Sequence, residues 1–209
     1  MLNYLNVHAT RLFLAGALLA VVTAVGVGCG GSSSDSTTKA SFAGLVQKKP
    51  SPVPPLALRD SLGNPLNIDS YRGKAVLVTF IYDHCPDVCP IIVGNLHTAQ
   101  KQLGSEADQL QVIAVSVDPK GDTPKTVKAF LSQHQMTGKM EYLIGSRPQL
   151  ERTWKAWGIA THVPKKNPDL VEHSAEIFGI SGSGKITTLY PANFKPSEIV
   201  HDVPMLAAS

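Results

Sequence analysis

The chain has 209 residues and a formal net charge of +3 at pH 7. Its lysines and arginines form no block, and the two adjacent pairs, Lys48-Lys49 and Lys165-Lys166, each lie beside a proline, as solvated loop charges do. The charge pattern therefore excludes a nucleic-acid-binding patch, and the length suits one domain with a tether.

The N-terminus has the pattern of an export signal. Residues 12–28 form an unbroken run of apolar, Gly and Thr residues, and Arg11 is the only charged side chain among the first 34. The run ends at Cys29, and the Gly/Ser-rich segment after it cannot pack as a core helix would. We therefore predict that residues 1–29 are a secretory signal or a membrane anchor.

Small residues before Cys29 and a Gly/Ser tether after it resemble a bacterial lipoprotein signal, in which Cys29 is lipidated after cleavage. An uncleaved anchor is the alternative. In both cases we expect the domain at the extracytoplasmic face of the bacterial cytoplasmic membrane, where thiols can oxidise.

A tether and the first strands are predicted next. Residues 30–55 are rich in Gly, Ser and Thr and then in Pro, which predicts a flexible tether. Residues 55–68 have two short apolar stretches around a Gly-Asn-Pro turn, which predicts a β-hairpin. The β-branched and aromatic run over 74–82 lacks clean alternation, as is typical of a central strand buried on both faces.

The rest of the chain alternates between helices and strands. Helical spacing and start signals predict helices over 91–104, 123–134, 147–159 and 195–209, the last interrupted at Pro204. Apolar runs predict strands over 110–118 and 140–145 and a β-hairpin over 174–191, after a polar loop over 161–173. This order predicts that residues 56–209 form an α/β, thioredoxin-like three-layer fold with a terminal β-hairpin plus helix.

Chemistry in such a sheet is expected at the carboxyl ends of the strands. Cys85 follows one such end and Asp118 lies at another. Because crossover connections bring these loops together, we expect the two residues to share one edge of the sheet.

Cys85 and Cys89 lie in the stretch FIYDHCPDVCP, where a hydrophobic run ends. Buried core thiols fit poorly with polar neighbours such as Asp83 and His84, and a disulfide across so short a loop would remove little entropy from the unfolded chain. A helix N-terminus favours thiolate and hence a redox-active pair, although the usual redox spacing has two intervening residues instead of three. If both lie on a first helical turn, residues four apart share one face, and two soft thiolates would select copper(I) or zinc.

A metal held by two cysteines needs another protein ligand, and histidine is the obvious candidate. His84 adjoins Cys85, and neighbouring residues seldom point the same way. His162 and His173 bracket the polar loop, and His173 precedes an apolar strand, from which it could face the cysteines across a cleft. The remaining candidates lie on predicted helices, where an exposed or core role is expected: His97, His134 and His201. Spacing alone leaves the third ligand open.

Three segments, FIYDHCPDVCP, VSVDPKGDTP and VEHS, resemble the signatures of the Sco/SenC family in order and separation. The resemblance runs from about Pro55 to the end. It implies a membrane-tethered, thioredoxin-like protein that binds one copper ion per chain. Such proteins help to assemble the binuclear copper centre of cytochrome c oxidase, as metallochaperone, as thiol reductant of the target cysteines, or as both.

The resemblance also implies the site and its partners. Cys85, Cys89 and His173 match the copper ligands of the family, and Asp118 matches an acidic position near the metal, which makes it an accessory residue. The implied partners are the copper-bearing subunit of the oxidase and a periplasmic copper donor. The approach IYDHC departs from the Gly-Phe-Thr type of many members.

The rival interpretation is a metal-free extracytoplasmic thiol–disulfide oxidoreductase or peroxidase that uses Cys85 and Cys89 as a redox-active pair. The three-residue spacing and the presence of His173 argue against it. A peroxidase also needs a threonine and an arginine around its reactive cysteine, and Thr79 is the only threonine nearby.

Overall fold

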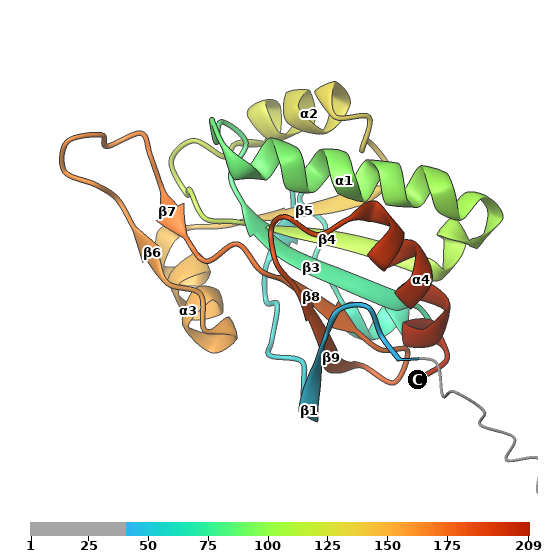
Figure 1. Cartoon of the computed structure of the whole chain (residues 1–209). Helices are drawn as coiled ribbons and strands as arrows, with labels where there is room; N and C mark the ends of the chain where they lie inside the picture. Colours follow the sequence, from blue (N-terminus) through green and yellow to red (C-terminus); the bar gives the residue numbers. More distant parts are fainter. Residues whose placement is uncertain (1–40) are drawn as a thin grey trace, which may run out of the picture. The chain divides into compact units, whose positions relative to one another are not determined.

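The computed structural model describes residues 41–209. The predicted signal and Cys29 lie outside the described residues. A seven-stranded sheet with the order β1-β9-β8-β3-β4-β5-β2 forms the centre of the described part, and β6 and β7 form a separate pair (Figure 1). The strands are β1 (Leu45–Pro52), β2 (Arg59–Asp60), β3 (Ala75–Ile81), β4 (Leu110–Ser116), β5 (Met140–Ile144), β6 (Thr161–His162), β7 (Glu172–His173), β8 (Ile177–Ile180) and β9 (Lys185–Tyr190).

Helices cover both faces of the sheet. They are α1 (Val88–Leu103), α2 (Pro124–Gln133), α3 (Arg147–Trp157) and α4 (Pro196–Ala207). Figure 1 shows α1 and α4 side by side on one face and α3 on the other. The Trp157 ring of α3 packs against Phe80 of β3 and Phe178 of β8, with ring centroids 5.7 and 5.1 Å apart. These layers confirm the predicted three-layer α/β fold.

Strand β3 is the centre of the core, and all seven of its residues are buried. It pairs in parallel with β4, from Ala75↔Leu110 to Ile81↔Ser116. On its other side it pairs antiparallel with β8. The carboxyl ends of β3 and β4 therefore meet at one edge of the sheet, as predicted, and the segments that hold the cysteines and Asp118 leave from this edge.

Helices α2 and α3 begin where the sequence predicted, whereas α1 begins three residues before the predicted start at residue 91. Thr123 caps α2 by accepting the Thr126 N–H at 3.2 Å, and Pro124 occupies the first turn. Ser146 precedes α3 with a proline in its first turn. Proline fits there because its missing N–H has no intrahelical partner at that position. Among residues 41–209, no helix combines the length and apolarity needed to cross a membrane.

The predicted tether over 30–55 is wrong in its C-terminal part. Leu45–Pro52 form β1, the edge strand that pairs antiparallel with β9. An edge strand tolerates Pro50 and Pro52, because the N–H groups on its outer side have no partner strand. Lys48 and Lys49, taken as loop charges, are exposed on this edge, where charge opposes pairing with another chain.

Two other predictions need correction. The predicted hairpin over 55–68 is reduced to a single antiparallel bridge, Arg59↔Pro65, and β2 pairs instead with β5. The predicted interruption at Pro204 is absent, and α4 runs through it to Ala207. Pro204 lies in the last turn, so the helix loses a hydrogen bond only near its end.

The buried Asp202 of α4 binds the N-terminal segment of the described domain through hydrogen bonds. Its carboxylate accepts hydrogen bonds from the backbone N–H groups of Ala43 and Gly44 at 2.8 and 2.9 Å and from the Tyr190 hydroxyl at 2.7 Å. A glycine is needed at Gly44, because a Cβ there would lie 2.5 Å from a carbon of the Tyr190 ring. One carboxylate thus joins β9, α4 and the segment that leads into β1.

We predict that Asp202→Ala lowers the free energy of unfolding by about 3 kcal/mol, because each buried donor left without a partner costs about 1–3 kcal/mol. Chemical denaturation of both proteins measures the difference. Asp108→Ala, at an exposed position, is the control and should change stability by less than about 0.5 kcal/mol. Equal stability of the two variants would contradict the role given to Asp202.

Candidate metal centre

The two cysteines lie between the end of β3 and the first turn of α1. Cys89 is in the first turn of the helix, whereas Cys85 lies in the preceding loop, where its backbone N–H donates to the Tyr82 carbonyl at 3.4 Å. Both are buried free thiols. The helix begins at Val88 and not at residue 91 as predicted, so its first turn contains Cys89 but not Cys85, and the condition that both sulfurs lie on one helical turn is not met.

His173 reaches the cysteines from β7, which pairs antiparallel with β6 through Thr161↔His173. Its Nε2 atom lies 3.9 Å from the Sγ atom of Cys89. Its Nδ1 atom lies 2.7 Å from the Ser174 carbonyl oxygen, which can only accept, so Nδ1 carries the proton. In the neutral form of the ring with its proton on Nδ1, the lone pair of Nε2 points toward Cys89.

The two thiols differ in acidity. A hydrogen bond from Cys89 is the main cause that lowers the pKa of Cys85 to about 5, and backbone N–H groups of Asp87 and Cys89 act in the same direction against burial. The hydrogen bond to Cys85, together with burial, raises the pKa of Cys89 well above its ordinary value. At neutral pH the metal-free reduced pair therefore holds one thiolate, on Cys85, and one proton, on Cys89.

The family model for SCO1/SenC matches residues 46–208. The chain belongs to the SCO1/SenC family. It is 26% identical over 156 residues to the SCO1 protein homolog of Bacillus subtilis (strain 168), with 72% of this chain and 80% of that protein covered.

Solved SCO1/SenC structures have the same fold. Apo Sco1 from Thermus thermophilus is 28% identical with a TM-score of 0.69, over 79% of this chain and 97% of that one. ScoI from Bradyrhizobium japonicum, solved with copper bound, is 28% identical with a TM-score of 0.64, over 78% of this chain and 99% of that one. The comparisons confirm the family and the thioredoxin-like fold that the sequence predicted.

Tyr82 is a residue of this SCO1/SenC site that the sequence analysis missed. Its side chain is buried, and its hydroxyl accepts the Val171 N–H at 3.3 Å. Its ring meets the His173 ring edge-on, with centroids 6.1 Å apart. Burial raises the pKa of Tyr82 to about 12, so the hydroxyl keeps its proton and can donate to Cys85. Tyr82 thus connects the cysteine loop to the strand of His173. The sequence offered one sign of this role, because Tyr82 lies in the stretch IYDHC, which departs from the Gly-Phe-Thr type of many family members.

Asp118, the predicted accessory residue, faces His84. Its Oδ2 atom lies 3.3 Å from His84 Nε2, and its Oδ1 atom accepts the Lys120 N–H at 3.0 Å. The structure therefore brings His173 to Cys89 and places the thiols of Cys85 and Cys89 in hydrogen-bond contact, whereas Asp118 faces a different side chain. Its accessory role toward a metal stays a prediction.

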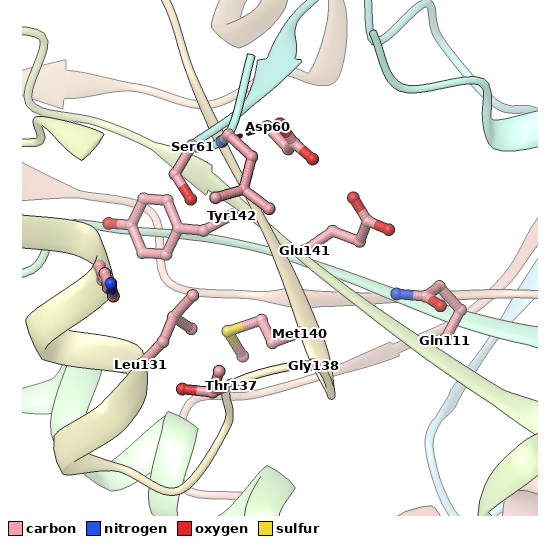
Figure 2. A pocket seen from close by; sticks show the side chains of 11 residues that line it. Asp60, Ser61, Gln111, Leu131, Thr137, Gly138, Met140, Glu141 and Tyr142 are labelled. Carbon is pink, nitrogen blue, oxygen red and sulfur yellow. Dashed lines mark hydrogen bonds between the residues drawn. The ribbon is translucent and has the colours of Figure 1, made fainter. Parts of the chain in front are cut away.

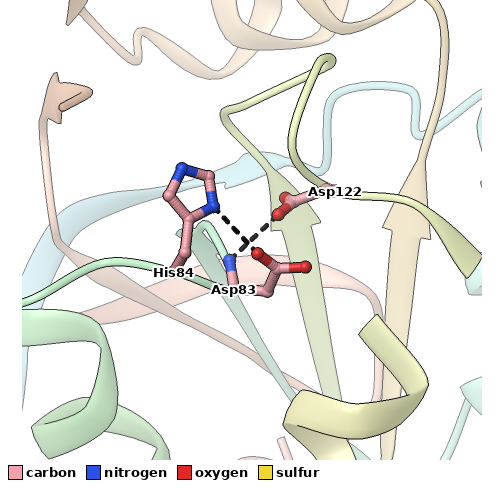
Figure 3. A group of neighbouring side chains, drawn as sticks. All are labelled: Asp83, His84 and Asp122. Atoms are coloured by element: carbon pink, nitrogen blue, oxygen red, sulfur yellow. Dashed lines mark hydrogen bonds and ion pairs between the residues drawn. The ribbon is translucent and has the colours of Figure 1, made fainter. Parts of the chain in front are cut away.

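Asp122 is a second residue that the sequence analysis missed. It is buried, and its carboxylate accepts the Asp83 N–H and the Tyr142 hydroxyl, both at 2.9 Å. Burial raises the pKa of Asp122 to about 7. Figure 3 shows Asp122 beside Asp83 and His84, the two residues that immediately precede Cys85 in the sequence.

A separate pocket of about 290 Å³ lies beside β5 and α2 (Figure 2). Leu131, Met140 and Tyr142 form part of its wall. Cys85, Cys89 and His173 are not among its lining residues, so this pocket is not the metal centre.

The acidity of Cys85 gives a pH-dependent prediction. Because its pKa is lowered to about 5, alkylation of the reduced metal-free protein by a small reagent should rise through pH 5 and level off below pH 7. Cys89→Ala removes the main cause of the low pKa, so the midpoint should move upward in this variant. Peptide mass spectrometry across the pH range identifies the modified sulfur. A wild-type midpoint near the free-cysteine value of about 8.5 would contradict the prediction.

Proposed function

We propose that this SCO1/SenC protein binds one copper ion per chain and helps to assemble the binuclear copper centre of cytochrome c oxidase. The observation that carries the proposal is the 3.9 Å approach of His173 Nε2 to Cys89 Sγ. In zinc sites, metal–sulfur and metal–nitrogen bonds are about 2.3 and about 2.0 Å, so two atoms at this separation can bind a single ion of similar size. Family membership and the copper-bound ScoI relative support copper as that ion.

The donors suit copper(I) as cargo. The low pKa of Cys85 favours a thiolate, His173 offers Nε2 as an imidazole donor, and ligands of this kind select copper(I) over hard cations. Cys89 must lose its proton to become a ligand, so copper loading releases a proton. Copper(II) prefers a tetragonal set of nitrogen and oxygen donors, which Asp118 or water would help to supply.

The same pair of thiols can act as the reductant of the target cysteines. The Cys85 thiolate attacks a target disulfide, which forms a mixed disulfide and releases one target sulfur as a thiolate. Cys89 then loses its proton and attacks the Cys85 sulfur, which releases the second target sulfur and leaves a Cys85–Cys89 disulfide. Two electrons pass to the target. The oxidised pair has no thiolate for copper, so the redox state of the pair controls loading.

The opposite acidities of Cys85 and Cys89 favour this exchange, and they equally suit the rival, a metal-free oxidoreductase. That rival leaves unexplained why His173 turns its free ring nitrogen toward Cys89. A peroxidase is further disfavoured, because Thr79 is buried within β3 and not beside Cys85. Copper titration of the reduced protein separates the two functions.

We also propose that the domain is exported and held at the extracytoplasmic face of the cytoplasmic membrane through Cys29. The proposal rests on the apolar run over 12–28 and the Gly/Ser segment after Cys29. Mass spectrometry of the purified membrane form should find a lipid-modified Cys29 as the first residue. Residues 1–28 still attached would show instead that the anchor is uncleaved.

The thiols give the first test of copper binding. Cys85→Ser and Cys89→Ser should each weaken copper(I) binding by more than about 100-fold, because losing even an outer-shell partner costs about 10- to 100-fold. Competition with a chromophoric copper(I) chelator measures the affinity. Asp87→Asn, which changes an exposed side chain between the two cysteines, is the matched control and should bind as wild type. Unchanged affinity in both serine variants would overturn the assignment.

His173 gives the second test. His173→Ala should weaken copper(II) binding more than copper(I) binding, because copper(I) accepts two thiolates whereas copper(II) requires further nitrogen or oxygen donors. Optical and electron paramagnetic resonance spectra of the copper(II) form report the change. His162→Ala is the control, because His162 is an exposed residue of β6 that pairs with Glu172 of β7. Identical copper(II) spectra and affinity for wild type and His173→Ala would remove His173 from the site.

A further inference from the structure

A second group of metal-ligating side chains lies directly before the thiols. Asp83, His84 and Asp122 each offer one ligand atom, and these atoms lie within 4.8 Å of one another. Figure 3 shows the His84 ring and the Asp122 carboxylate on either side of Asp83. Asp83 and His84 come from the loop after β3, and Asp122 comes from the loop after β4.

The Asp83 carboxylate is buried and only partly satisfied. Its side chain is 6% exposed, and its Oδ1 atom lies 2.9 Å from His84 Nδ1. Its Oδ2 atom is buried without a hydrogen-bond partner in the described part of the chain. A buried carboxylate oxygen without a partner is costly, so this oxygen is available to a cation.

Charge is unbalanced around His84. Three carboxylates, on Asp83, Asp118 and Asp122, surround a single imidazole. Within residues 41–209, no lysine or arginine forms an ion pair with any of the three. The imidazole can carry one positive charge at most, so it cannot balance more than one ionised carboxylate of the three.

The arrangement also orients His84 as a ligand. Its Nδ1 atom shares a hydrogen bond with Asp83 Oδ1 at 2.9 Å, and its Nε2 atom lies 3.3 Å from Asp118 Oδ2. An ion that binds at Nδ1 would displace the proton of this hydrogen bond and leave the remaining ring proton on Nε2, next to the Asp118 carboxylate. A carboxylate behind a histidine is a common way to fix the tautomer of a metal ligand. Gly121 keeps the space open, because a Cβ there would collide with the His84 ring and the Asp118 carboxylate. His84 itself is 42% exposed, so an ion can enter from solvent.

We propose that Asp83, His84 and Asp122 form a second cation site, which takes a divalent transition-metal ion of the zinc class and has Asp118 as the outer partner of His84. One imidazole nitrogen and carboxylate oxygens suit zinc(II) or copper(II), whereas copper(I) prefers the neighbouring sulfurs. The site is distinct from the proposed copper site, because it uses neither thiol and not His173.

The test uses the full-length Cys85→Ser/Cys89→Ser protein, so its outcome does not depend on the proposed copper site. Isothermal titration with zinc(II) should show one ion bound per chain. Asp83→Asn, which keeps the shape of the side chain, should weaken binding by more than about 100-fold, and Asp118→Asn by about 10-fold. Asp87→Asn is the matched control, because it removes an exposed carboxylate from the same loop and should leave binding unchanged.

His84→Ala provides a second loss-of-binding variant at a partly exposed position, in case Asp83→Asn unfolds, and circular dichroism monitors the fold of each protein. Zinc(II) binding that fails in the double serine protein would overturn the proposal. Equal affinity in the Asp87→Asn variant and in the folded Asp83→Asn or His84→Ala variant would also overturn it. The cluster would then be an internal ion pair of a protonated His84 with its carboxylates.

Discussion

The pairing of β3 with β8 determines where the proposed metal centre lies. The antiparallel register Thr79↔Ile177 places the end of β3 beside the start of β8. The cysteines follow β3, and His173 precedes β8, so one pairing brings together side chains that are 84 residues apart in the sequence. Tyr82 reinforces this arrangement, because its hydroxyl holds the Val171 N–H just before β7. The geometry of the site is therefore a product of the central sheet and not of the cysteine loop alone.

The electrostatics of the same edge explain how a metal-free protein could be ready for a cation. Cys89 keeps its proton, because its hydrogen bond to Cys85 and its burial raise its pKa. The charge of Asp122 also raises the pKa of Cys89. A second thiolate is therefore unfavourable until a positive ion arrives. Asp122 shows the same effect, since burial raises its pKa to about 7. An edge of the sheet with this much negative potential favours a cation. The cysteines offer such a cation sulfur donors, and the carboxylates offer it oxygen donors.

Much of this organisation could be predicted from the sequence. The buried runs of β3 and β4 and the capping signals of α2 and α3 gave correct elements, because burial and local hydrogen bonding decide them. Strand β1 was missed, because its prolines and lysines are not typical of a strand. It is an edge strand that depends on pairing with β9, which is distant in the sequence.

Residue type and the family resemblance pointed to the two sulfurs and His173, whose role as metal ligands stays a prediction, and the structure places His173 beside Cys89. The supporting residues Tyr82 and Asp122 were not predicted. Tyr82 lies at the end of a hydrophobic stretch, and only the fold shows that its hydroxyl reaches Val171. Asp122 has an ordinary position in a loop, and only the pairing of β3 with β4 buries it beside Asp83. Contacts of this kind depend on tertiary structure, which local patterns do not encode.

The most direct measurement of the central claim is X-ray absorption spectroscopy of the protein loaded with one equivalent of copper(I). The account predicts two sulfur ligands and one nitrogen ligand, with the nitrogen signal absent from His173→Ala. A site with a single sulfur, or a nitrogen signal that persists in His173→Ala, would contradict it.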